Sequence, residues 1–241
     1  MQPDPSVILE TLAIREPLIG LYDAPDPAPF APLVGPKGSR TCVFASRSQW
    51  LAGKTLHISK DRHGCGAPHL LGVQARTRAE MVDFLVGEEG LRATPELMES
   101  WLDSQPGYQP RHEHVLLGPL KADQYEHLLS VTFYVSADQL SVLCTGASYY
   151  SRPDDPAPVI APFSSGCGQL AAVFADLGGV QAAIGATDQA MRQYLPTDLL
   201  AFTVTRPMFE RLCDWAADPG SSLHNSFLKR LMKARGGSLA L

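Results

Sequence analysis

The chain has 241 residues, with 45% hydrophobic residues, 19% charged residues and a formal net charge of −5. This length allows one large domain or two small ones with a substantial buried core. The acidic balance leaves no broad basic surface, which argues against nucleic acid as a partner.

The sequence also bears on the compartment of the protein. No apolar run reaches the ~18 residues of a membrane-spanning helix, and residues 1–5 lack the basic region and apolar stretch of a signal peptide. We therefore expect a cytoplasmic protein with no membrane partner. The five cysteines would then stay reduced, and each could be a buried residue, a metal ligand or a reactive thiol.

The first half of the chain predicts short helices and strands in alternation. Residues 6–15 favour an amphipathic helix capped by Ser6, and residues 17–22 a buried strand. Prolines across residues 24–36 predict an extended loop. Further helices are expected over 41–51, from 77 and from 94, and further strands over 53–58 and 115–120.

The second half continues this pattern. A short helix over 124–130 and a strand over 131–135 lead to a helix that opens at Ser136, and a second proline-rich loop covers 151–162. Next come an apolar helix to about Leu177, a strand over 180–185, a helical turn at 188–194 and a strand over 199–204. The chain ends with a helix over 207–216 and a basic amphipathic tail at 227–233. Together these predict a single α+β domain over 1–241, a mixed sheet with short helices on its faces.

Three cysteines share a local context. Cys42, Cys65 and Cys167 each follow a glycine-containing loop and precede an apolar, helix-like run. A thiol at such a helix start lies near unpaired backbone N–H groups. These groups and the helix dipole both favour the thiolate form over the thiol. Flanking small residues would let a bulky ligand approach the backbone, and those expected to line a cofactor are Gly64, Gly66, Ser165, Gly166 and Gly168. The alternative is that each cysteine is simply a small residue in a tightly packed part of the fold. Cys144 and Cys213 lie on apolar helical faces and are expected in the core.

Thiolates from three separated loops suit an iron–sulfur cluster with one non-cysteine position, or a zinc site. His69, four residues after Cys65, is the expected fourth ligand, and His63 is the other candidate nearby. The remaining histidines are expected to be solvated or hydrogen-bonded (His57, His127, His224), or to point the same way along an extended segment (His112 and His114).

Several of these features together resemble the domain-of-unknown-function family numbered 169. They are the segment 16–21, Cys42 at a short helix, Cys65–Gly66–Ala67 followed by Leu71–Gly72, the step at 118–120 and the segment 163–167. The resemblance covers residues 7–233. It implies a single domain whose cysteine-bearing loops act together, and it implies no reaction.

Three functional hypotheses remain open. The leading one is a cytoplasmic binding protein with a thiolate-ligated metal centre at Cys42, Cys65 and Cys167, an iron–sulfur cluster before zinc. The second is a protein that binds a tetrapyrrole or another bulky cofactor. The third is a metal-free enzyme with Cys65 or Cys167 as nucleophile and a nearby histidine as base. Dinucleotide-binding, P-loop and GxSxG patterns are absent from the sequence. A small-molecule or redox partner is compatible with all three hypotheses.

Overall fold

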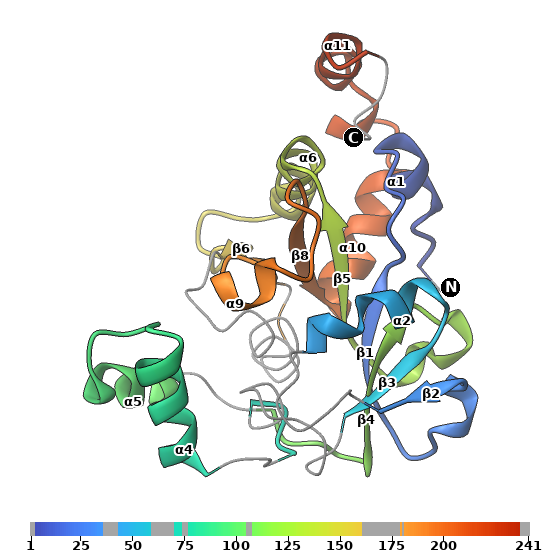
Figure 1. Cartoon of the computed structure of the whole chain (residues 1–241). Coiled ribbons are helices and arrows are strands. Elements are labelled where there is room, and N and C mark those ends of the chain that lie inside the picture. The colour runs from blue at the N-terminus through green and yellow to red at the C-terminus, as the bar shows by residue number, and fades with distance from the viewer. Residues whose placement is uncertain are drawn as a thin grey trace.

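The computed structural model describes residues 3–35, 43–58, 70–73, 77–104, 108–160, 179 and 181–236. All strands in these residues belong to one mixed sheet of eight strands, in the order β2-β3-β4-β1-β5-β8-β7-β6 (Figure 1). This sheet, with helices on both faces, confirms the predicted α+β fold. The strands are β1 (Ile19–Ala24), β2 (Leu33–Val34), β3 (Thr55–Ile58), β4 (His114–Pro119), β5 (Leu128–Val135), β6 (Val159–Ile160), β7 (Ala182–Gly185) and β8 (Leu200–Thr205).

The two faces of the sheet each carry a hydrophobic core, because side chains alternate along the central strands. On the first face, Leu21 and Ile58 belong to a core shared with η2 (Val43–Ser46), α2 (Arg47–Leu51), α4 (Arg78–Asp83), η3 (Phe84–Glu88), α5 (Pro95–Ser104) and α9 (Gln189–Arg192). On the second face, Tyr22 and Leu116 belong to a core shared with α1 (Ser6–Thr11), α6 (Ala137–Ser148) and α10 (Arg206–Ala217). The short elements η1 (Ala28–Phe30), η4 (Ala122–His127), η6 (Ser222–His224) and α11 (Ser226–Ala234) complete the described chain.

Helix starts follow the caps that the sequence provides. Ser136 and Gln139 form a reciprocal capping box at α6, and Thr94 accepts a hydrogen bond from the Leu97 N–H at 3.3 Å, at the start of α5. The predicted cap at Ser6 is wrong: Pro5 takes the cap position of α1. No helix of the described residues is long and apolar enough to cross a membrane.

Each proline-rich loop contains a two-residue edge strand that sequence reasoning did not predict. β2 follows Pro32 and pairs in parallel with β3, and β6 follows Pro158 and pairs in parallel with β7. Proline is tolerated at the start of an edge strand, where its missing N–H interrupts no ladder. β2 and β6 are therefore the two outermost strands of the sheet.

The sheet consists of two halves with the same topology. The order β1-β4-β3-β2 in one half matches β5-β8-β7-β6 in the other, with the same parallel and antiparallel pairings. β1 and β5 are antiparallel neighbours at the centre, so an approximate two-fold axis perpendicular to the sheet relates the halves. We refer to this relationship as the internal repeat.

One pair of hydrogen bonds confirms the register of the internal repeat. The Thr55 N–H at the start of β3 donates to the Pro32 carbonyl at 3.0 Å, and the Ala182 N–H at the start of β7 donates to the Pro158 carbonyl at 2.8 Å. The sequences at these positions agree as well, with PLVGP from residue 32 and PVIAP from residue 158.

Candidate functional site

Four of the seven histidines of the chain lie at one end of the central strands of the sheet. The carboxyl ends of β1 and β3 meet the amino ends of β4 and β5 there. His57 is the penultimate residue of β3, and His114 opens β4. His112 precedes β4 by two residues, and His127 ends η4 just before β5. We call this part of the molecule the histidine edge.

The four histidines form two pairs. His57 Nε2 and His114 Nδ1 lie 3.2 Å apart, so one ring nitrogen donates a hydrogen bond to the other. The rings of His112 and His127 meet edge to face, with centroids 5.9 Å apart. The expectation that His57 is hydrogen-bonded is confirmed, and the same holds for His224, whose Nε2 lies 2.8 Å from the Ala216 carbonyl oxygen.

A buried carboxylate holds the loop beside these histidines. Asp23, in β1, is 4% exposed. Its oxygens accept hydrogen bonds from the Tyr108 hydroxyl and from the backbone N–H groups of Arg111, at 2.7 Å, and His112, at 3.0 Å. Three hydrogen bonds to one buried carboxylate offset the free-energy cost of removing it from water. The loop that leads into β4 is therefore fixed to β1.

Tyr108 extends this connection to a second segment. Its N–H donates to the Leu70 carbonyl at 2.9 Å. Gly72 has a φ of +72°, and a Cβ at this position would overlap the Tyr108 carbonyl oxygen, so this turn requires glycine. The chain thus leaves the histidine edge at Ile58 of β3 and is anchored near the same edge again at Leu70.

The predicted ligands and cofactor-lining residues lie outside the described residues. They are Cys42, Cys65, Cys167, His63, His69, Gly64, Gly66, Ser165, Gly166 and Gly168. Two described residues adjoin this set in the sequence. Val43, directly after Cys42, and Leu70, directly after His69, belong to the same core on the first face of the sheet.

The internal repeat relates two of the three cysteines. Cys42 lies in the connection from β2 to β3, and Cys167 lies in the equivalent connection from β6 to β7. Cys42 follows Pro36 by six residues, and Cys167 follows the corresponding Pro162 by five. The two cysteines therefore occupy equivalent connections of the two halves.

The two cysteines within the described residues have a different environment. Cys213 is buried in the core on the second face, and burial raises the pKa of its thiol to about 12. Cys144 is half-buried against the same core, and burial raises its thiol pKa too. A protonated thiol is a poor ligand and a poor nucleophile. The prediction that both belong to the core is confirmed for Cys213, and Cys144 lies at the margin of that core.

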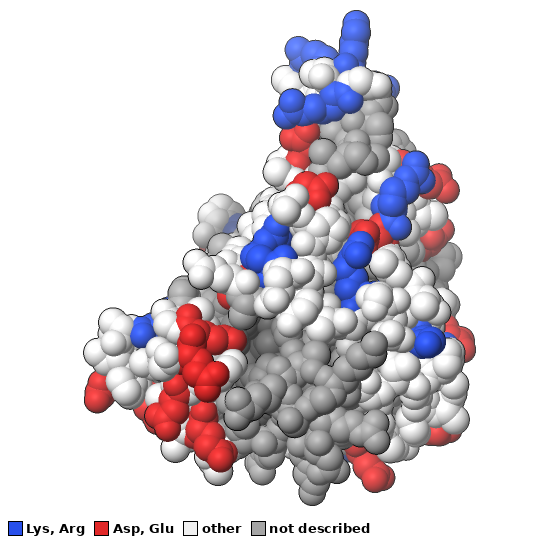
Figure 2. All heavy atoms as spheres, viewed as in Figure 1, with Lys and Arg blue, Asp and Glu red and all other residues white. Residues whose placement is uncertain are grey.

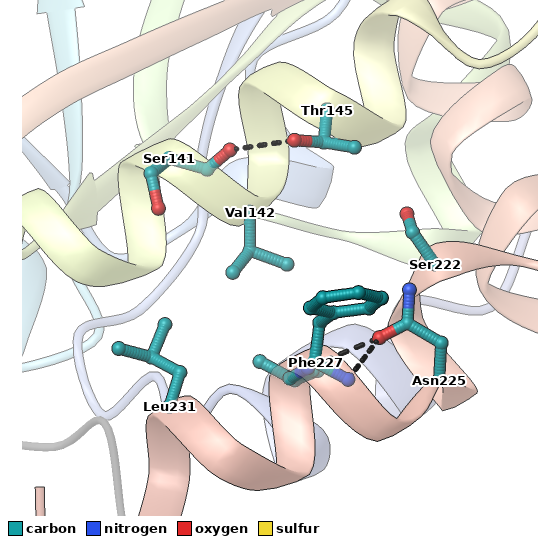
Figure 3. A pocket seen from close by; sticks show the side chains of 8 residues that line it. Ser141, Val142, Thr145, Ser222, Asn225, Phe227 and Leu231 are labelled. Atoms are coloured by element: carbon teal, nitrogen blue, oxygen red, sulfur yellow. Dashed lines mark hydrogen bonds between the residues drawn. The ribbon is translucent and has the colours of Figure 1, made fainter. Parts of the chain in front are cut away.

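The described surface has hollows elsewhere. One, of about 230 Å³, lies between α6 and α11 (Figure 3), where its lining side chains are Ser141, Val142, Thr145, Ser222, Asn225, Phe227, Leu228 and Leu231. Another is lined by Tyr150, Arg152, Asp155, Arg211 and Asp214. Neither lining contains a cysteine or a histidine. Figure 2 shows acidic side chains gathered over α4 and α5 and basic ones over α11.

Sequence reasoning did not single out Asp23, Tyr108 or the pairing of His57 with His114. One signal for Asp23 was available, because an aspartate that ends a buried strand needs hydrogen-bond donors nearby. Within the described residues, no group of three or more histidine, cysteine or acidic side chains is placed to hold a metal ion.

These observations define an α+β protein with an internally repeated sheet and a cysteine in each of two equivalent connections. Comparison with known families identifies it further. The family model DUF169, described as uncharacterised ArCR, matches residues 9–214. The chain therefore belongs to domain-of-unknown-function family 169, as its resemblance implied. No curated protein and no solved structure matches the chain.

Proposed function

We propose that this chain is a cytoplasmic binding protein that holds a metal centre on the thiolates of Cys42, Cys65 and Cys167. An iron–sulfur cluster is the first candidate for the occupant, because it accepts three thiolates and one other ligand. Zinc is the second metal that suits this set of donors. His69 is the proposed fourth ligand.

The observation that carries this proposal is the internal repeat. A cysteine at a similar distance after the repeated proline segment, in each of two equivalent connections, supports a shared role for Cys42 and Cys167. Packing alone would require a small residue there and not a thiol. Each cysteine follows a similar proline-bounded segment, which supports the same conclusion.

The chain segments around Cys42 and Cys65 support the proposal in a second way. Val43 and Leu70 share one core on the first face, so the ends of the two segments approach the same face of the sheet. The contrast with Cys213 also supports it, because that thiol stays protonated by burial, whereas a thiol at the start of a helix favours the thiolate.

Anaerobic purification of the full-length chain tests which occupant is present. Broad absorption across the near-ultraviolet and visible range, with iron and acid-labile sulfide in equal amounts, is the expected result. A colourless protein with stoichiometric zinc would support the thiolate centre, with zinc as its occupant in place of an iron–sulfur cluster. A sharp, intense band would identify a tetrapyrrole, and a colourless protein without metal would leave only thiol chemistry.

A further inference from the structure

We propose that His57 and His114 form a second, separate metal site, which binds a divalent transition-metal ion such as Zn²⁺, Ni²⁺ or Cu²⁺ through two imidazole nitrogens. This site belongs to the histidine edge and does not depend on the proposed thiolate centre. Imidazole is a preferred ligand for these three ions.

The distance between the two rings fits this role. His57 Nε2 and His114 Nδ1 are 3.2 Å apart. Two nitrogens that each lie about 2.0–2.1 Å from one tetrahedral ion are separated by about 3.3 Å. The two nitrogens therefore already have the separation that a shared tetrahedral ion requires. Binding requires that each ring carry its proton on the nitrogen that faces away from the partner.

The strand register places both rings on the same face. His57 lies opposite Leu116 in the antiparallel pair of β3 and β4, and His114 is two residues from Leu116 along β4. Side chains two residues apart share a face of a strand, so His57 and His114 are diagonal neighbours. Both side chains are half-buried, which limits their motion and leaves access from solvent.

The internal repeat shows that the sheet itself does not need histidines here. In the second half, Ile184 lies opposite Phe202, as His57 lies opposite Leu116. Ile184 and Leu200 occupy the positions equivalent to His57 and His114, and both pack against the core on the second face. The same backbone arrangement is thus filled by an apolar pair in one half and by two metal-binding side chains in the other.

The proposed site supplies two protein ligands. No third histidine, cysteine or acidic side chain of the described residues completes a cluster around a metal ion.

The test uses Cu²⁺ ions and the full-length protein after treatment with a chelator. Electron paramagnetic resonance of the copper complex reports how many nitrogens coordinate the ion. We expect one equivalent of copper with splitting from two nitrogens. In the double variant His57→Ile/His114→Leu, which copies the second half, we expect this signal to be lost while circular dichroism is unchanged. His224→Gln is the matched control and should retain the signal.

Two outcomes would overturn this inference: a wild-type spectrum without two-nitrogen splitting, or the same splitting in the double variant. If the double variant does not fold, His57→Gln and His114→Gln replace it. Each should reduce the splitting from two nitrogens to one, and an unchanged spectrum in both would overturn the inference.

A Cys65→Ser variant separates this inference from the proposed function. It should keep the two-nitrogen signal, because the two proposed ligands are the imidazole nitrogens of His57 and His114. Loss of the signal in Cys65→Ser, together with its retention in the double variant, would place copper at the thiolate centre and reject the histidine site alone. A two-nitrogen signal in a protein that never contains iron, sulfide or zinc would reject the thiolate centre alone.

Discussion

The Tyr108 hydroxyl donates a hydrogen bond to the buried carboxylate of Asp23, which lies 85 residues earlier in the chain. This contact joins the end of β1 to the loop that precedes β4 and, through the Tyr108 backbone, to Leu70. The stability of the histidine edge should therefore depend on it.

We expect Tyr108→Phe to lower the free energy of unfolding by about 1–3 kcal/mol, because a buried carboxylate loses one of its donors. Urea unfolding followed by circular dichroism measures the change. Tyr149→Phe is the control, since the Tyr149 hydroxyl donates to Asp218 at 3.1 Å on the exposed surface, and a surface substitution should change stability by about 0.5 kcal/mol or less. Equal effects of the two substitutions would show that the buried contact has no special role.

Gly72 offers a second test of the same region. Gly72 and Gly53 both have positive φ, +72° and +74°, but a Cβ at Gly53 would meet nothing within 4 Å. Gly53→Ala should cost only the backbone strain, about 1 kcal/mol. Gly72→Ala should cost about 1–3 kcal/mol more, because the new methyl overlaps the Tyr108 carbonyl. Thermal unfolding of both variants measures the difference, and equal losses would contradict the tight turn at Gly72.

The thiol of Cys213 predicts a dependence of stability on pH. Its pKa is raised from 9.0 to about 12 in the fold, so above pH 9 the unfolded chain loses this proton while the folded chain keeps it. Stability contributed by this group should be constant below pH 9 and should fall as the pH rises from 9 to 12.

Cys213→Ala isolates this contribution. We expect the variant to lose less stability between pH 9 and pH 11 than the wild type, in unfolding curves measured at both values. A wild type and variant with the same pH slope would show that the thiol ionises equally in the folded and unfolded states.

The sequence predicted those parts of the fold that depend on local pattern. The helices predicted to open at Ser136 and from residue 94 begin there, with Ser136 and Thr94 as caps. β5 covers the predicted strand over 131–135 but begins at Leu128, within the segment 124–130 that was expected to be helical. β2 and β6 were not predicted because their proline-rich sequences favour loops, and they become strands only by pairing with β3 and β7. The internal repeat was not predicted either, because it is defined by the order in which the strands pair, and local sequence patterns do not indicate that order.

The histidine edge shows a similar limit. His57 and His114 are 57 residues apart, and only the register of β3 against β4 brings their rings together. The same is true of Asp23 and Tyr108. Residue types indicated candidate chemistry at each position, but the pairing of distant positions follows from the tertiary structure. Whether Cys42, Cys65 and Cys167 act as one site stays a prediction.

The most direct test of that prediction is the metal content of the anaerobically purified Cys167→Ser variant, measured by mass spectrometry beside the wild type and Cys144→Ser. Serine keeps the size of cysteine and removes the soft thiolate ligand. We predict bound iron or zinc in the wild type and in Cys144→Ser, and its loss from Cys167→Ser. Full metal occupancy in Cys167→Ser, or a wild type without metal, would contradict the proposed centre.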